Sequence, residues 1–329
     1  MLASDNALIP RLANQAVRVV MSVAGVLLVL IFLFIPTGTV SATTSSAGKD
    51  GRQIVKQMLK ATSQQPFVYE EQSMILIDKS NNRDVRDIRR YLRVDSSNKA
   101  RVLLVFDAPE EIKGVALLVV VNSDRQQQGG IYLPAFEKRL LTADSQGGAD
   151  RFLGSDFSVF DLQPENMNDF IYTRLDDVQI NEVDFYTVEA RPKNAKVFEQ
   201  TGYKRRILTI SKQGFMPVKA TYFDRYNRLL KILTRHHFKN YGGDTWLPDM
   251  MLMDNIRENH KTLLKTRQRV FSADYVPVRM FKTDWLFANR HMASTIEHVF
   301  ENTLTPRGHP VQSKHSEPAA LDAQGSPVQ

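Results

Sequence analysis

Few residues of this sequence have the type and spacing that chemistry needs, and none of them forms a catalytic motif. His236 and His237 are adjacent, so in an extended strand their rings point to opposite faces and cannot bind one metal ion together. Glu258 and His260 lack the His-Glu-x-x-His spacing that presents a zinc site on a helix. The sequence contains neither a Gly-x-Ser-x-Gly elbow nor a Gly-x-x-x-x-Gly-Lys phosphate loop. We therefore expect no catalytic residue, no metal site and no cofactor.

Adjacent carboxylates are the remaining candidates for general acid–base chemistry. They occur at residues 70–71, 110–111 and 176–177. Neighbouring acids in a sequence are usually solvated residues of turns or strands, and such a pair alone is a weak signal for a catalytic site. An enzyme acting on lipid or glycan would need acids from distant strands to meet in one cavity. We therefore predict that the protein is not an enzyme.

The N-terminus has the pattern of an export signal. Two arginines precede an apolar run over residues 19–35, and residues 40–42 (Val-Ser-Ala) offer a peptidase cleavage site. We predict that residues 1–42 are a signal peptide cleaved after Ala42, which places the protein in the periplasm. The alternative is that residues 19–35 remain as an anchor in the inner membrane, because a run of about 17 apolar residues is at the lower limit for spanning a bilayer.

Composition and charge limit the class of protein and of partner. The chain has 329 residues, of which 43% are hydrophobic and 24% charged, which is enough to build a large core. Cysteine is absent, so disulfides, thiolate metal ligands and lipid attachment through a lipobox cysteine are excluded. The net charge is +7. In an exported protein a positive surface suits anionic lipid or an acidic protein partner, and we expect no nucleic-acid partner.

The elements that follow the signal are one helix and then many strands. Residues 43–50 are expected to form a flexible leader, and Asp50 can cap a helix over residues 51–62. The apolar residues of this helix fall on one face, as in an amphipathic helix: Ile54, Val55, Met58 and Leu59.

About a dozen strands are expected after this helix, because short apolar runs alternate with turn signals. Their connections are too short for parallel crossovers, which favours an antiparallel meander. So many strands do not form a flat open sheet, and we predict a strongly curved sheet or barrel. The expected strands span residues 67–77, 85–94, 100–107, 114–121, 130–134, 138–143, 168–175, 183–191, 203–211, 216–223, 228–238, 245–253 and 260–271.

Residues 51–290 are expected to form one domain. Within it, residues 115–121 are apolar at every position, so this strand must be covered on both faces. A short closing helix is predicted over residues 279–290. Residues 303–329 are rich in Pro, Ser, Gln and Gly, and are expected to be a disordered tail.

Two strand segments could bind a ligand. In residues 261–269 four basic side chains share one parity, and we interpret them as the outward face of a strand rather than as a reader of anions: Lys261, Lys265, Arg267 and Arg269. Residues 250–253 (Met-Met-Leu-Met) could fit varied apolar guests, because methionine is flexible and polarizable, although it also fills ordinary cores.

Several short motifs resemble the outer-membrane lipoprotein-sorting protein-like family, part of the LolA-like and LppX-like superfamily. One is Tyr-Leu-Pro-Ala at residues 132–135, with basic residues soon after. A second is the signature loop Gly154, Ser155, Asp156, Phe157 and Ser158, followed by Asp161-Leu162. A third is residues 219–231, which resemble the family's hairpin of tyrosine, aspartate, glycine, leucine and lysine, with Asn227 in the place of the glycine. We interpret the signature loop as a tight loop anchored by Phe157 rather than as a ligand contact.

The resemblance implies a strongly curved, unclosed antiparallel β-barrel that is covered by helices and encloses a hydrophobic cavity. It also implies a periplasmic carrier or chaperone for a lipid or for the acyl chain of a lipoprotein. The alternative is a non-catalytic accessory subunit of an inner-membrane exporter of the resistance-nodulation-division (RND) type. An RND-type transporter or an outer-membrane acceptor would then be the protein partner. From strand parity, the candidate cavity contacts are Leu104, Phe106, Leu118, Val120, Ile232, Met250, Met251 and Met253.

Overall fold

The computed structural model describes residues 50–63, 65–97, 99–122, 127–134, 139–142 and 151–293. The predicted signal peptide (1–42), all but the last residue of the predicted leader, and the predicted tail (303–329) lie outside these ranges and stay predictions. None of the helices in the described part of the chain is long and apolar enough to span a bilayer.

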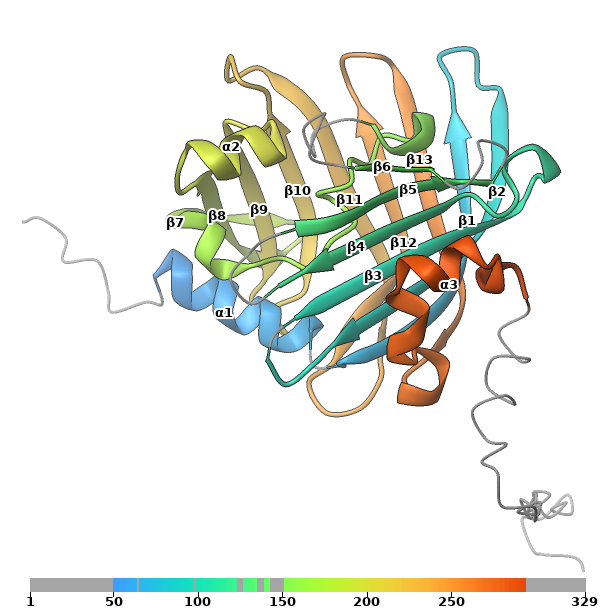
Figure 1. The fold of residues 1–329 in the computed structure, drawn as a ribbon. Helices are drawn as coiled ribbons and strands as arrows, with labels where there is room; N and C mark the ends of the chain where they lie inside the picture. The colour runs from blue at the N-terminus through green and yellow to red at the C-terminus, as the bar shows by residue number, and fades with distance from the viewer. Residues whose placement is uncertain are drawn as a thin grey trace, which may run out of the picture. The chain divides into compact units, whose positions relative to one another are not determined.

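Thirteen strands form one antiparallel sheet, and their order is β6-β5-β4-β3-β2-β1-β13-β12-β11-β10-β9-β8-β7 (Figure 1). Strands that follow one another in the chain are neighbours, except β6 and β7, which form the two edges, while β1 and β13 pair with each other. This is the order of a barrel that is left open between β6 and β7. The expected curved and unclosed antiparallel barrel is confirmed.

The strand bounds agree closely with the runs that hydrophobic alternation and turn residues predict. They are β1 (Phe67–Ile77), β2 (Arg83–Val94), β3 (Ala100–Ala108), β4 (Ala116–Val121), β5 (Gln127–Leu133), β6 (Arg139–Thr142), β7 (Phe170–Ile180), β8 (Val183–Pro192), β9 (Arg205–Ser211), β10 (Pro217–Phe223), β11 (Leu229–Asn240), β12 (Trp246–Asn255) and β13 (His260–Val270).

The first helix, α1 (Gly51–Thr62), covers part of the inner face of the curved sheet. Asp50 caps it as expected, because its side chain accepts a hydrogen bond of 2.7 Å from the backbone N–H of Gln53. The buried Ile54, Val55 and Met58 pack in a large cluster with residues of both halves of the sheet. The segment 152–162 contributes to the same cluster, so side chains of α1 and of this segment fill part of the interior.

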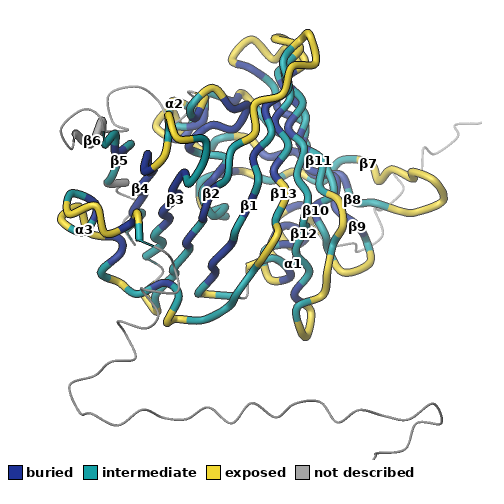
Figure 2. The backbone as a smooth tube through the Cα atoms, turned by 90° about the vertical axis from the view of Figure 1, so that its right-hand side faces the viewer, coloured by how far each residue is buried: buried dark blue, intermediate teal, exposed yellow. Residues whose placement is uncertain are grey.

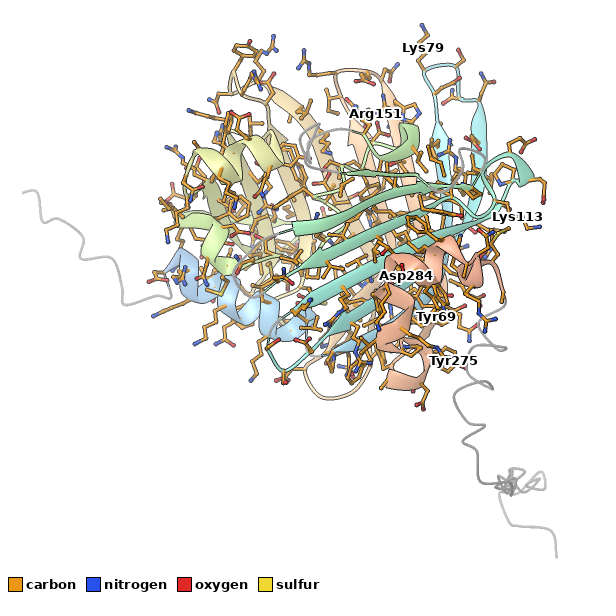
Figure 3. All side chains as sticks on the ribbon, viewed as in Figure 1. Tyr69, Lys79, Lys113, Arg151, Tyr275 and Asp284 are labelled. Atoms are coloured by element: carbon orange, nitrogen blue, oxygen red, sulfur yellow. The ribbon has the colours of Figure 1, made fainter. Side chains whose placement is uncertain are left out.

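The outer face of β1 to β5 has a second core under the C-terminal segment (Figures 1 and 3). Tyr275 of this segment lies against Tyr69 of β1, with ring centroids 5.3 Å apart. The segment has four short helical elements: η6 (Ala273–Tyr275), η7 (Val278–Phe281), α3 (Thr283–Phe287) and η8 (Arg290–Met292). The short closing helix predicted over residues 279–290 is present as α3, but its predicted bounds are too wide, because Lys282 is extended and Asn289 is left-handed.

Strand β4 lies between these two cores, which confirms that it is covered on both faces. Leu117 and Val119 belong to the inner cluster, and Leu118 and Val120 to the outer one. Figure 2 shows buried residues along β3 and β4 and exposed residues at the hairpin turns, including the projecting β7–β8 hairpin.

One helix was missed from the sequence. It is α2 (Ala195–Thr201), between β8 and β9. Asn194 caps it by accepting a hydrogen bond from the N–H of Val197, and Gly202 ends it with a positive φ of 70°. Both signals are visible in the sequence, so a search for caps would have found the helix.

Candidate functional site

A pocket of about 260 Å³ opens on the inner face of the sheet. It lies between the end of α1, residues 157–165 and the strands β1, β2 and β9 to β13. Part of its wall is apolar, with contributions from Met58, Phe157, Leu208, Leu233, Met251 and Leu264. The rest of the wall is polar and carries seven charged residues. Small-molecule binding sites usually combine an apolar wall with a few placed polar groups. This pocket has both, and it carries more charge than is usual.

Four of the eight cavity contacts expected from the sequence lie on the inner face. Met251 lines the pocket. Leu104, Phe106 and Met253 are buried in the inner cluster around it and do not reach the pocket wall.

The structure does not bring the other four to this pocket. Leu118 and Val120 pack under the C-terminal segment on the outer face. Ile232 is next to Leu233 and Met250 is next to Met251, and both of these neighbours line the pocket, so Ile232 and Met250 point to the outer face as well. Strand β4 is apolar on both faces, so its inner parity cannot be read from the strand itself. In β11 the inner parity is the one that carries charge, at Lys231 and Arg235, and for this reason the apolar Ile232 was chosen wrongly.

One wall of the pocket is built around the buried carboxylate of Glu70. Its oxygens accept hydrogen bonds from Arg269 Nε at 2.6 Å and from Arg90 Nη1 at 2.9 Å. Burial would raise the pKa of Glu70, but the two arginines lower it below its ordinary value of 4.5. Arg90 lies on β2 between the apolar residues Ile88 and Leu92, which share its face of the strand. Its ion pair with Glu70 on the neighbouring strand explains why a charged residue stands at this inward position.

The inward position of Arg269 corrects the prediction that it shares an outward face with Lys261, Lys265 and Arg267. Glu70 is paired with Arg269 and Gln72 with Thr266, so β13 has one extra residue opposite β1. A bulge of this kind reverses the alternation beyond it. Arg269 is accordingly only 4% exposed, whereas Arg267 stays outside and pairs with Asp87.

A second charged group joins residues 160–165 to strands β7 and β9. Arg206 makes two hydrogen bonds with the carboxylate of Glu165, at 2.8 and 3.2 Å. Tyr172 donates to the same carboxylate at 3.0 Å. The guanidinium of Arg206 also lies over the ring of Phe170, 4.2 Å from its centroid. The segment is thus held against β7 and β9 at the pocket.

The signature loop is fixed to β12 and β13 by Asp156, which is completely buried. Its carboxylate pairs with His260 Nδ1 at 2.6 Å and accepts hydrogen bonds from Thr262 Oγ1 at 2.7 Å and Asn255 Nδ2 at 3.2 Å. Arg151, labelled in Figure 3, lies beside this group and pairs with Glu258. His260 and Glu258 therefore hold the loop, and among the described residues no group of three or more His, Asp or Glu is placed to hold a metal ion.

The end of the signature meets the hairpin motif from 70 residues later in the chain. Asp161 accepts a hydrogen bond from Lys231 Nζ at 2.7 Å, and Lys231 also donates to the carbonyl of Asp156 at 2.8 Å. Ser158 and Tyr203 donate to the same Asp161 carboxylate. The signature loop and the hairpin motif therefore form one structural unit, which holds residues 151–165 inside the curved sheet, whereas Tyr132 of the Tyr-Leu-Pro-Ala motif lies in the outer core.

Two details bear on the interpretation of these motifs from the sequence. Phe157 is buried in the inner cluster, as an anchor should be, but it also lines the pocket, where the interpretation expected no ligand contact. Asn227 has a φ of 63°, so it supplies the left-handed turn that glycine usually provides at this point of the hairpin.

We predict that acid will destabilise the protein through Glu70 and Asp161. Burial would raise the pKa of Asp161, but Lys231 lowers it, and the pKa of Glu70 is lowered by its arginines. Groups with a lowered folded pKa stabilise the fold at high pH, and this contribution is lost as the pH falls. The free energy of unfolding in urea should therefore fall below about pH 4.5, by about 1.4 kcal/mol for each unit by which a pKa is lowered.

Glu70→Gln tests this assignment, because it removes one of the two titrating groups. The free energy of unfolding should depend less steeply on pH in this variant. In Glu111→Gln, which alters an exposed glutamate, the pH dependence should equal that of the native protein. An unchanged slope in Glu70→Gln would contradict the ion pairs described above.

Comparison with known proteins gives the same fold. A family model with the description "-like: Uncharacterized protein" matches residues 98–287. No curated protein matches the chain. A Vibrio parahaemolyticus domain, assigned provisionally as an outer membrane lipoprotein-sorting protein, is similar with 24% identity and a TM-score of 0.67 over 72% of this chain and 98% of that one.

Two further structures are similar. A DUF1329 family protein from Desulfovibrio piger has 21% identity and a TM-score of 0.63, over 70% of this chain and 98% of its own. A LolA superfamily protein from Nitrosomonas europaea has 16% identity and a TM-score of 0.58, over 72% of this chain and 100% of its own. At these identities the likeness shows the fold, and the chemistry must be argued from the pocket.

Proposed function

Because this chain belongs to the family of uncharacterized proteins whose model matches residues 98–287, and because its fold is that of a LolA-like unclosed barrel, we propose that it is a periplasmic carrier that binds a lipid or the acyl chain of a lipoprotein. The pocket on the inner face is the observation that carries the proposal. The name of one similar structure, an outer membrane lipoprotein-sorting protein domain, supports a lipoprotein as the cargo.

The volume of the pocket sets how much of a chain can enter. Small-molecule pockets measure about 300–1,000 Å³, so a pocket of about 260 Å³ takes a short chain or one end of a longer one. Each methylene that leaves water contributes about 0.8 kcal/mol. Eight methylenes would thus contribute about 6 kcal/mol before ordering costs. A longer chain requires α1 or residues 151–165 to move away from the sheet.

Two neighbouring methionines in β12 point to opposite faces of the sheet, which allows a matched test. Met251 lines the pocket, and Met250, the next residue, points to the outer face. Met251→Trp fills the pocket, so binding of the uncharged apolar probe N-phenylnaphthylamine should weaken at least about tenfold. Met250→Trp should change it less than about twofold. Fluorescence titration measures both, and thermal unfolding checks that the variants are folded.

Native mass spectrometry of the protein purified gently from the cell envelope should detect bound lipid. Reproducibly empty protein that takes up neither lipid nor the probe would overturn the carrier proposal. If such empty protein is recovered in a stoichiometric complex with an inner-membrane transporter, the accessory-subunit alternative takes its place.

A further inference from the structure

The charges that line the pocket are paired with one exception. Its carboxylates are those of Glu70, Asp161 and Glu165, and each has a basic partner. Glu70 binds Arg90 and Arg269, Asp161 binds Lys231, and Glu165 binds Arg206. The fourth arginine of the lining, Arg235, has no ion pair with any carboxylate of the described residues.

Arg235 instead donates a hydrogen bond of 3.3 Å from Nη1 to the backbone carbonyl of Pro217. Burial lowers the pKa of its guanidinium, and Arg206 lowers it further. Tyr222, Glu165 and Asp161 act in the opposite direction, but the pKa stays below its ordinary value, so these groups compensate the charge only in part. Arg235 is half-buried, and a charge that is partly removed from water without a counter-ion is costly, so proteins normally pair it. An arginine kept in this position is therefore suited to a partner that arrives with the ligand.

A second polar group of the same wall is also unsatisfied. The Nε of Arg206 is buried without a hydrogen-bond partner in the described residues, although the terminal nitrogens of this side chain bind Glu165. Arg206 and Arg235 both line the pocket and lie on β9 and β11, the two neighbours of β10. Two arginines stand against the single carboxylate of Glu165 here, so this side of the pocket has an excess of positive charge.

Arg235 also lies next to the apolar wall. It is paired with Met251 across the β11–β12 ladder, and Leu233 is two residues away on the same inner face. We propose that the pocket binds an acidic amphiphile, with its carboxylate or phosphate against Arg235 and its hydrocarbon chain against the wall of Met251, Leu233 and Leu264. This inference rests on the proposed carrier function and names the chemical class of its ligand.

Dodecanoate and dodecanol test the inference, because they share a twelve-carbon chain and differ in the charge of the head group. Displacement of the neutral probe gives the affinity of each. The native protein should bind dodecanoate at least about tenfold more tightly than dodecanol, since a charge-assisted hydrogen bond is stronger than a neutral one. Arg235→Gln should lose this preference and keep its affinity for dodecanol within about twofold.

Two further variants separate charge from folding. Arg235→Lys should retain a preference for dodecanoate, and Arg225→Gln, which alters an exposed arginine on the β10–β11 turn, should behave like the native protein. Equal affinity of the native protein for dodecanoate and dodecanol would overturn the head-group inference alone. Binding of neither would overturn the carrier function with it. If acetate at equal concentration displaces dodecanoate, the pocket is a site for free anions, and the proposal that it binds an amphiphile is overturned.

Discussion

Asp161→Asn is expected to lower the free energy of unfolding by about 3–5 kcal/mol, which is the usual effect of removing one partner of a buried ion pair. Asp161 is 1% exposed and Lys231 is 6% exposed, so the lysine would keep a buried charge without its counter-ion. The variant also weakens the acceptor for Ser158 and Tyr203. Urea unfolding monitored by circular dichroism measures the loss.

The double variant Asp161→Asn/Lys231→Met is the control for this prediction. It removes both charges, so its stability should exceed that of Asp161→Asn, because replacing a whole buried pair costs less than breaking it. Asp176→Asn alters an exposed aspartate and should change the free energy of unfolding by less than about 0.5 kcal/mol. A loss as small as this in Asp161→Asn would contradict the role of the pair.

Phe157→Ala is expected to cost about 3–5 kcal/mol of stability, because it leaves a cavity where a large side chain is buried. Phe157 belongs to the inner cluster and to the pocket wall, and it is the central apolar residue of the signature loop. Its loss should loosen residues 151–165 as well as destabilise the fold. Hydrogen exchange should show faster exchange of the amides that the loop protects, such as Asp156 N–H, which donates to Thr262.

Phe157→Leu separates packing from any effect of the ring itself. A smaller apolar side chain fills part of the same space, so the expected loss is about 1–2 kcal/mol. If Phe157→Ala unfolds at the same urea concentration as the native protein, the loop is not anchored by this residue. The signature would then need another explanation than a structural one.

Most of the sheet follows from local patterns. Alternating apolar residues and turn signals predict strands close to the observed β1 to β13, because both are properties of a few neighbouring residues. The helix over residues 51–62 follows in the same way from its apolar face and from the cap at Asp50. The curvature follows from the number of strands, and the resemblance of the motifs supplied the type of fold.

The inner and outer faces did not follow from the sequence. Strand β4 is apolar at every position, so only the packing of α1 on one side and of the C-terminal segment on the other shows that Leu117 points inward and Leu118 outward. A single bulge brings Arg269 into the pocket against the alternation of its own strand. The candidate contacts chosen by parity were therefore divided between the two faces.

The sequence by itself determined where the strands and the first helix lie and which short motifs are present. The tertiary structure decided which of these residues meet: Asp161 with Lys231, Asp156 with Thr262, and Arg235 with no carboxylate of the described residues. Local patterns depend on residues that are a few positions apart in the chain. The charge balance of the pocket depends on strands that are more than a hundred residues apart, and these come together only when the sheet curves.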